Sequence, residues 1–265
     1  MTEALRLGGY SLELELGRGA VGVVYRGRSA DGRVVALKTF DPALADDETF
    51  RARLAHEARV AREIEDTHLV RILEAGDDDG HPYLVLEYLA GGSLAERLAD
   101  GPLSLGEMLG VVAEVAAGLD ILHRGGIVHR DVKPSNVMFR EDGSAALTDF
   151  GLAKGVAYTV LTRPGEVLGT LDYLAPELIR GGKATPASDL YALGCVAFEC
   201  LTGRPPFADR SLFGVGTAHL EDDPPDPPAS PEVGWALLRA LEKDPAERPV
   251  TATTYAHLLR TAAGR

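Results

Sequence analysis

The stretch HRDVKPSN, residues 129–136, combines an imidazole, two other basic side chains, a carboxylate, an amide and a proline. Such a mixture is unsuited to a hydrophobic core, because every charged group buried there would need a partner. The stretch follows a long apolar helical pattern and precedes a short strand pattern, so we expect a loop on a rigid base. Loops placed in this way commonly carry binding and catalytic groups.

A second polar group follows thirteen residues beyond Asn136, where Asp149 opens the sequence DFG after another short strand pattern. Asn136 and Asp149 offer the hard oxygen ligands that suit Mg²⁺, which prefers few protein ligands plus phosphate oxygens and water. Asp131 would then accept a hydrogen bond from a substrate hydroxyl, and Lys133 would neutralise charge on a phosphoryl group. Any one of these aspartates alone is better explained as a turn or cap residue.

The glycines at the N-terminal end repeat as Gly17-x-Gly19-x-x-Gly22-x-Val24, between two predicted strands. Glycines in a hairpin let backbone N–H groups approach phosphates without obstruction by side chains. The dinucleotide-binding version of this pattern runs from a strand into a helix, which is not the case here. Taken alone, the pattern fits a glycine-rich turn equally well.

The sequence VALK, residues 35–38, places Lys38 on a predicted strand just after the glycine pattern. A lysine on an inward face needs an anion. Glu57 is the best candidate, because it lies beside the apolar stripe of a helix predicted over 47–64. A lone strand lysine is usually a solvated edge residue, but its place after the glycine-rich hairpin favours a functional role.

The first 90 residues read as a sheet with one helix. Alternating leucines and a turn at Asp31-Gly32 predict a three-strand meander, and two further strands follow the helix. These five strands are predicted over residues 12–16, 21–27, 33–40, 69–76 and 82–89.

Beyond a hinge at Gly91-Gly92 the pattern becomes mainly helical. The capping box Ser104-x-x-Glu107 opens a long helix with apolar positions at Met108, Val111, Val112, Val115, Leu119 and Leu122. Short strands flank the turn at 141–143. Helices are also predicted near 187–202, closed by Gly203, near 211–220, near 232–243 and near 252–261, and four prolines over 224–228 mark a rigid loop. We therefore expect two lobes of a single domain, residues 1–90 and 91–265.

Composition excludes several classes of protein. The 265-residue chain carries a net charge of −13, which argues against nucleic-acid binding. Cys195 and Cys200 lie in an apolar run and read as reduced and structural, in a reducing compartment. No window reaches the ~18 apolar residues of a membrane span. We expect a cytoplasmic protein, and a longer, membrane-anchored parent stays open.

The glycine pattern, VALK, HRDVKPSN, DFG and finally Ala175-Pro176-Glu177 follow one another in the order typical of one family. The chain resembles a eukaryotic-like protein kinase catalytic domain of the bacterial serine/threonine type, over roughly residues 10 to 260. The resemblance implies an α+β, bilobal fold with a small five-stranded antiparallel lobe and a larger helical lobe. It implies transfer of the ATP γ-phosphoryl group to protein Ser/Thr hydroxyls, with Mg²⁺, or alternatively Mn²⁺, as the metal.

The resemblance also assigns roles to residues. ATP would lie between the lobes, with Lys38 on its phosphates and paired to Glu57, Asn136 and Asp149 on the metal, and Asp131 and Lys133 at the reacting groups. The ATP contacts implied are Leu16, Gly17, Gly19, Gly22, Val24, Ala36, Lys38, Leu86, Glu87, Leu89 and Met138. Thr159 and Thr162 in the activation segment, residues 152–174, are the predicted autophosphorylation sites, with Arg130 as the phosphate's partner. Thr170 is expected to have a structural role near the substrate site instead.

Further matches are structural. Asp189 resembles the buried helix aspartate that braces the catalytic loop, and Arg248 resembles the arginine that pairs with Glu177. His129 and Phe150 resemble two members of the hydrophobic column of the active state. The chain departs from the usual pattern at Val21, at residues 66–70 and at Ala61, which puts the position of the first-lobe helix in doubt.

Two other classes of function stay open at this stage. A pseudokinase scaffold would lack a metal ligand or the lysine, and none is missing here. A small-molecule phosphotransferase would usually lack the Ala-Pro-Glu motif and the long activation segment. Neither the protein substrate nor a homodimer through the small lobe can be read from the sequence.

Overall fold

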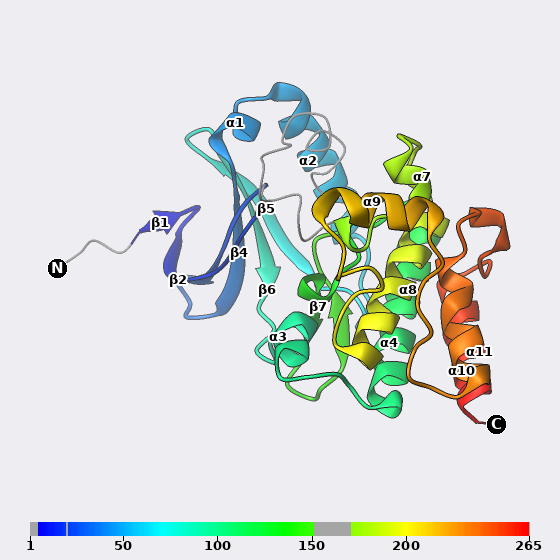
Figure 1. The fold of residues 1–265 in the computed structure, drawn as a ribbon. Helices are drawn as coiled ribbons and strands as arrows, with labels where there is room; N and C mark the ends of the chain where they lie inside the picture. Colours follow the sequence, from blue (N-terminus) through cyan, green and yellow to red (C-terminus); the bar gives the residue numbers. More distant parts are fainter. Residues whose placement is uncertain (1–4, 20, 151–170, 265) are drawn as a thin grey trace. The chain divides into compact units, whose positions relative to one another are not determined.

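The computed structural model of the chain describes residues 5–19, 21–150 and 171–264. These residues form two compact units, one of residues 5–89 and one of residues 90–150 together with 171–264. Figure 1 shows the sheet and helices of the first unit in blue and cyan, and the largely helical second unit in green to red. Each unit has its own elements and core.

The first unit is built on one antiparallel sheet of six strands in the order β1-β2-β3-β4-β6-β5. The strands are β1 (Arg6–Leu7), β2 (Tyr10–Gly19), β3 (Gly22–Arg28), β4 (Val34–Phe40), β5 (Ile72–Asp78) and β6 (His81–Glu87). The prediction of five strands was therefore one short. Gly8 and Gly9, with φ of 57° and 84°, make the tight turn that lets β1 fold back onto β2.

The predicted alternation along β2 was wrong beyond Leu12. The pairing of β2 with β3 shifts register between Leu12 and Leu14 and again between Glu15 and Gly17. Each shift adds an unpaired residue and turns the following side chains to the other face of the sheet. As a result Leu14 and Leu16 are 54% and 42% exposed. Sequence period alone cannot anticipate such bulges.

The core of the sheet lies on one face of β4 and β6. Four buried residues form a cluster, Val35, Leu37, Tyr83 and Val85, and the partly buried Leu7, Tyr10, Leu12 and Leu73 pack against it. Tyr10 and Tyr83 both donate to the Glu74 carboxylate at 2.8 Å. The pairing satisfies two phenols at a sheet face that would otherwise bury them unpaired.

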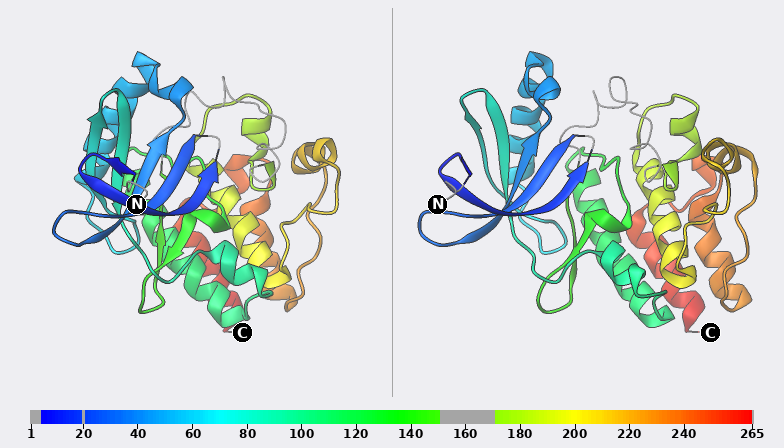
Figure 2. Two further views of the ribbon diagram at one scale, coloured as in Figure 1. Left: turned by 90° about the vertical axis from the view of Figure 1, so that its left-hand side faces the viewer. Right: turned by 60° about the vertical axis from the view of Figure 1, so that its left-hand side comes forward.

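The helix of this unit was predicted correctly, and a shorter one was missed. α2 (Glu48–Arg62) begins at the cap Asp47, whose side chain accepts from Thr49 N and Phe50 N. The four apolar positions that predicted its inner face are all buried: Phe50, Leu54, Ala58 and Ala61. α1 (Pro42–Ala45) precedes it, with Asp41 as its cap. Figure 2 shows α1 and α2 next to the strands from two further sides.

The second unit is mainly helical, with one small two-stranded sheet. Its elements are α3 (Leu94–Ala99), α4 (Leu105–Arg124), η1 (Pro134–Asn136), β7 (Val137–Phe139), β8 (Ala145–Leu147), α7 (Pro176–Ile179), α8 (Pro186–Thr202), α9 (Leu212–Glu221), α10 (Pro231–Leu238), η2 (Arg239–Leu241), η3 (Pro245–Glu247) and α11 (Ala252–Ala263). In Figure 1, α4 and α8 run side by side, with α10 and α11 beside them.

Helix caps explain where these helices begin and end. Ser104 and Glu107 form the predicted capping box of α4, and all six apolar positions predicted for its inner face are buried. Ser93 and Glu96 form a second box that opens α3, a helix missed by the sequence reading although the signal is the same. Gly203 ends α8 with φ of 77°, as predicted.

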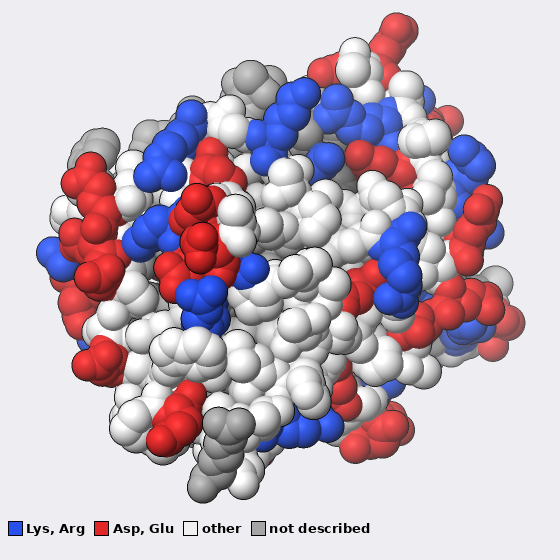
Figure 3. Space-filling model, turned by 90° about the vertical axis from the view of Figure 1, so that its right-hand side faces the viewer, with Lys and Arg blue, Asp and Glu red and all other residues white. Residues whose placement is uncertain are grey.

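Charges are mixed on the surface. The face in Figure 3 carries acidic and basic side chains around an uncharged area, with no continuous basic field on that face. Among the residues that the structure describes, no helix combines the length and the apolar character needed to span a bilayer. Cys195 and Cys200 are both buried and unpaired, and burial raises the pKa of each thiol.

Candidate active site

The stretch 129–136 forms a compact polar loop in the second unit. Asp131 is 7% exposed, and its Oδ2 atom lies 3.1 Å from Lys133 Nζ and 2.8 Å from Asn136 Nδ2. Asn136 Nδ2 also donates to the backbone carbonyl of Asp131 at 2.7 Å. The carboxylate is therefore held from two sides within the loop. Three of the predicted site residues thus meet at one point.

Asp189, at the start of α8, fixes the backbone of this loop. Its two oxygens accept from the backbone N–H groups of His129 and Arg130, both at 2.8 Å. Arg130 has a φ of 67°, a left-handed conformation that costs a non-glycine residue energy and persists only where the surroundings hold it. The brace predicted from the family resemblance is present in the geometry.

His123, at the end of α4, is a member of this brace that the sequence analysis missed. Its Nε2 atom lies 2.8 Å from Asp189 Oδ2, and its side chain is 12% exposed. The donors on Asp189 therefore come from α4 as well as from the loop. The apolar pattern of α4 gave no signal for it, because a histidine in a last helical turn more often interacts with the helix dipole.

His129, the first residue of the loop, is fully buried. Its Nδ1 atom accepts from Asp131 N at 3.2 Å, and its Nε2 atom lies 3.0 Å from Thr148 O. These two contacts assign the ring proton to Nε2, because a carbonyl can only accept. Burial lowers the pKa of His129, which keeps the ring neutral. Its ring centroid lies 6.5 Å from that of Phe150.

Asp149 follows β8, and the pairing of β8 with β7 ties the chain before Asp149 to the end of the loop. β7 pairs with β8, and Thr148 N donates to Asn136 O at 3.0 Å, so the residues before Asp149 are tied to Asn136. Asp149 itself has a φ of 62°. Both predicted metal ligands therefore emerge from the same small sheet, and the second of them on a constrained backbone.

The donor set fits a hard divalent cation. Asn136 uses its amide N–H groups on Asp131, so its carbonyl oxygen is the atom that can face a cation. No group of three or more His, Cys, Asp or Glu side chains in the described chain is placed to hold a metal. Few protein ligands are what Mg²⁺ tolerates when phosphate oxygens and water complete its shell.

A pocket of about 320 Å³ adjoins the loop within the second unit. Its walls include Leu98 of α3, Lys133 and Ser135 of the loop, Tyr173, and Glu199 of α8. Tyr173 donates to Glu199 Oε2 at 2.6 Å, and burial raises the pKa of Glu199. Tyr173 and Glu199 were not singled out from the sequence, since neither belongs to a short motif.

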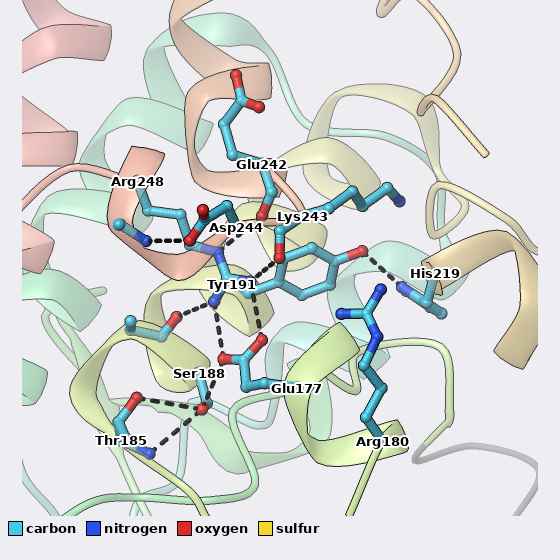
Figure 4. Close-up of polar contacts among 12 residues, drawn as sticks. Glu177, Arg180, Thr185, Ser188, Tyr191, His219, Glu242, Lys243, Asp244 and Arg248 are labelled. Atoms are coloured by element: carbon cyan, nitrogen blue, oxygen red, sulfur yellow. Dashed lines mark hydrogen bonds and ion pairs between the residues drawn. The ribbon is translucent and has the colours of Figure 1, made fainter. Parts of the chain in front are cut away.

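Arg248 and Glu177 form the predicted ion pair, shown in Figure 4. Both guanidinium Nη atoms lie 2.9 Å from the two carboxylate oxygens. Arg248 is 5% exposed and donates also to backbone carbonyls at Ala187, Glu242 and Lys243. A bidentate pair with every donor used is the form in which a buried pair can be stable. It ties α7 to α8 and to the segment before α11.

The glycine pattern lies across the end of the β2–β3 hairpin in the first unit. Gly17 pairs with Val24 and Gly19 with Gly22. Gly22 has a φ of 155°, and a Cβ atom there would fall 1.9 Å from the carbonyl oxygen of Thr39. The third glycine is thus required by close approach of β4, whichever ligand the hairpin binds. Leu16, Gly17 and Gly19 are exposed.

The strand register places several predicted ATP contacts on one sheet face. Val24 pairs with Lys38, which pairs with Leu84, and Ala36 pairs with Leu86. Directly paired residues point to the same side, which is opposite to the buried cluster of Val35 and Leu37. Lys38 is half-buried there. The alternation that predicted a shared face for Ala36 and Lys38 is confirmed.

The structure gives the position of the remaining residues predicted to contact ATP, but it does not test whether they surround one nucleotide. Glu57 is half-buried on α2, and its pairing with Lys38 stays a prediction. Leu86 and Leu89 are buried, and Glu87 N donates to Arg71 O at 3.0 Å within its own unit. Met138 belongs to the second unit, where it bridges Ser93. The predicted phosphosites Thr159 and Thr162, like Thr170, lie outside the described residues.

Comparisons with known proteins agree with this arrangement. Residues 10–259 match the family described as the protein kinase domain. The chain is 40% identical over 248 residues to the serine/threonine-protein kinase drp72 of Corynebacterium efficiens, covering 90% of this chain and 48% of that protein. It is 38% identical over 246 residues to the serine/threonine-protein kinase PknL of Mycobacterium tuberculosis, covering 90% and 62%. The chain thus spans less than two thirds of these relatives.

A solved structure matches over the full length. The PknI kinase domain of Mycobacterium tuberculosis superimposes with a TM-score of 0.78 at 30% identity, and the match covers 100% of both chains.

Proposed function

The chain belongs to the protein kinase domain family, and from that premise we propose that it transfers the γ-phosphoryl group of ATP to serine and threonine hydroxyls of proteins. The observation that carries the proposal is the Asp131 carboxylate, held by Lys133 and Asn136 in a loop braced by Asp189. Such a group can orient a hydroxyl without itself moving during the reaction.

Asp131 would act on the nucleophile. Phosphoryl transfer needs little covalent chemistry from the protein, so catalysis consists of alignment and neutralisation of charge. The Asp131 carboxylate would accept the hydrogen bond of the substrate hydroxyl and point its oxygen in line with the phosphorus. Because Asn136 holds the same carboxylate, one residue would couple the position of the nucleophile to the metal site.

Lys133 and Lys38 would handle the phosphate charge. Lys133 Nζ lies 3.1 Å from Asp131 and would reach the phosphoryl group as negative charge develops on it. Lys38 would bind the non-transferred phosphates, with Glu57 as its partner. Mg²⁺ bound at Asn136 and Asp149 would supply further positive charge to the phosphates. Mn²⁺ has similar ligand preferences and is an alternative at the same oxygens.

A radiolabel assay tests the proposal directly. The purified chain, [γ-³²P]ATP and a generic basic protein are incubated with and without Mg²⁺, beside the Asp149→Ala variant. We expect Mg²⁺-dependent label on Ser or Thr of the protein substrate, and loss of nearly all of it in the variant. Transfer by Asp149→Ala at the wild-type rate would contradict the assignment of the site.

The same assay separates the proposal from the two other readings. A pseudokinase scaffold predicts nucleotide binding without label on any protein. A small-molecule phosphotransferase predicts ATP consumption without label on Ser or Thr. The Asp131–Lys133–Asn136 cluster and the Glu177–Arg248 pair favour the protein kinase.

Autophosphorylation, at Thr159 or Thr162, is the second part of the proposal. It rests on Arg130, which precedes Asp131 and would pair with a phosphate through charge-assisted hydrogen bonds. A homodimer would serve transfer between two copies of the chain. Phosphopeptide mapping after incubation with ATP tests this, and phosphate found only outside 152–174 would exclude it. A reducing, cytoplasmic location agrees with the two unpaired buried cysteines.

A further inference from the structure

His219 of α9 lies in a cluster of polar and aromatic side chains that phosphoryl transfer does not use. The imidazole is fully buried, between the ring of Tyr191 at 5.6 Å and the ring of Phe207 at 4.9 Å, both edge-on. Lys243 Nζ lies 4.9 Å from the Phe207 ring, and the Arg248 guanidinium lies 4.9 Å from the Tyr191 ring. A cation thus lies against each aromatic ring, with one imidazole in the middle, as Figure 4 shows in part.

The hydrogen bond between the imidazole and Tyr191 suits the neutral form of the ring. Nδ1 lies 2.7 Å from the Tyr191 hydroxyl, and burial raises the pKa of this phenol, so it keeps its proton and can donate to a neutral Nδ1. The ring proton is then on Nε2, a buried atom for which the described residues offer no hydrogen-bond partner. No carboxylate in the described chain hydrogen-bonds this ring.

The charged neighbours would oppose a proton on this ring. From α8 it faces Tyr191, and after η2 comes Lys243, whose Nζ donates to Ala218 O at 3.1 Å. From the end of α7, Arg180 reaches the α9 carbonyl of Leu220 at 3.5 Å. Arg248 is engaged with Glu177 behind Tyr191. Protonation would add a positive charge near Lys243, on which the carboxylates of Asp222 and Asp223 also act.

The helix that carries His219 also contacts Leu171, two residues before Tyr173. A Cβ atom placed on Gly216 of α9 would lie 3.5 Å from Leu171 Cδ2, so the helix packs against that segment. Two residues further, Tyr173 lines the pocket that Lys133 and Glu199 share. The position of α9 therefore bears on the surface where a protein substrate would approach Asp131.

From this arrangement we propose that His219 is a positioning residue that holds α9 against α8 only while its imidazole is neutral, so that capture of protein substrates weakens on acidification while phosphoryl transfer itself does not. The inference rests on the proposed function for its consequence, but the latch between α9 and α8 is a property of the fold alone. Lys243 contributes by capping an α9 carbonyl from the other side of the cluster.

Hydrogen exchange tests the latch without any catalysis. Burial lowers the pKa of His219 to about 4, whereas an opened helix would restore a value of about 6.5. By linkage, the opening equilibrium of α9 should then rise about 20-fold between pH 7 and pH 5 in the wild-type chain. In His219→Gln, which keeps hydrogen-bonding capacity and cannot titrate, the rise should vanish once intrinsic exchange is corrected.

Hydrogen exchange of the α9 amides also provides the control and the result that would contradict the proposal. His257→Gln changes an exposed histidine on α11 and should keep the wild-type response. An equal response of α9 amides in His219→Gln and wild type would overturn the proposal. Because His219→Gln could fail to fold, the wild-type imidazole is also titrated by NMR. A pKa below the unfolded value of about 6.5 supports the latch, and one at or above that value overturns it.

Kinetics test the consequence for substrates. With a basic protein substrate, KM should rise on going from pH 7 to pH 5 in the wild type and stay level in His219→Gln. The kcat for a short Ser/Thr peptide should be the same in both at each pH. A KM that rises equally in both chains would overturn the link to substrate capture. Absence of all phosphoryl transfer would instead contradict the proposed function, and hydrogen exchange would still decide the latch.

Discussion

At the scale of single residues, the catalytic loop is defined by one buried carboxylate. Asp189 accepts two backbone N–H groups of the loop and the imidazole of His123, all at 2.8 Å. These contacts hold Arg130 in its left-handed conformation. Without them the loop would relax, and Asp131 would lose its position by an amount sufficient to slow an aligned reaction.

The Asp189→Asn variant is predicted to lose activity with little loss of folding. One carboxylate oxygen becomes an amide N–H, which repels either a loop N–H or His123, so Asp131 is misplaced. We expect kcat to fall by roughly 10- to 100-fold with KM for ATP nearly unchanged. Steady-state kinetics measure this. Asp209→Asn, in an exposed ion pair with Arg204, is the control and should leave kcat as it is; equal kcat in both variants would refute the role of Asp189.

The sequence could predict those functional residues that lie together in one short motif. Asp131, Lys133 and Asn136 lie within six positions of one another, and the structure brings them into contact. His123, Tyr173 and Glu199 were missed because each acquires its role from a distant partner: His123 and Tyr173 meet α8 residues 66 and 26 positions away. No local pattern encodes such pairs.

At the scale of elements, helix α11 is attached to α4 through a buried acid. Asp120 of α4 is 7% exposed and accepts from Ala252 N at 3.0 Å and Thr253 N at 3.1 Å, as well as from the Thr253 hydroxyl. These are first-turn donors of α11, which have no partner within their own helix. Asp120 thus serves as a cap supplied by another element.

The Asp120→Ala variant should therefore be destabilised more than an ordinary surface change. It leaves the first N–H groups of α11 without an acceptor at a buried junction, which costs about 1–3 kcal/mol in the free energy of unfolding. Chemical denaturation measures the change. Asp100→Ala, at the exposed end of α3, should change stability by less than about 0.5 kcal/mol. If the two variants proved equally stable, the Asp120 cap would make no contribution to the free energy of unfolding.

Helices and strands could be predicted where the hydrophobic period or the capping residues were intact. The predictions were wrong where the backbone departed from a regular helix or strand. The stripe of α2 and the capping box of α4 were correct because both are local. The alternation of Leu12, Leu14 and Leu16 failed because two bulges turn β2, and bulges depend on the partner strand. The two-residue strand β1 is too short for any period to register.

At the scale of the whole molecule, buried histidines make stability depend on pH. Burial lowers the pKa of both His129 and His219, the latter to about 4. A group whose folded pKa is depressed stabilises the fold fully above its unfolded pKa of about 6.5, and this contribution is lost as pH falls toward the folded value. Glu199, whose pKa is raised by burial, acts in the opposite direction on acidification.

We therefore expect the free energy of unfolding to fall between pH 7 and pH 5, with His219 alone contributing about 2 kcal/mol of the fall. Urea denaturation at each pH measures it. The slope should be smaller in His219→Gln than in His257→Gln, whose imidazole is exposed. Stability that rose on acidification over this range would contradict the neutral assignment of the buried rings.

The residues proposed as catalytic belong to both units, and a pair of variants can test whether they act on one nucleotide. Lys38 belongs to the first unit, and Asp149 to the second. If both serve the same phosphoryl transfer, Lys38→Met and Asp149→Ala should each remove almost all activity, and the double variant should be little worse than either, because groups that act as a unit are strongly non-additive. Single-turnover transfer of ³²P measures the three rates, with thermal unfolding to verify that each chain is folded. Losses that simply multiplied would indicate two independent contributions, and the proposal that Lys38, Asp131 and Asp149 converge on one ATP would fall.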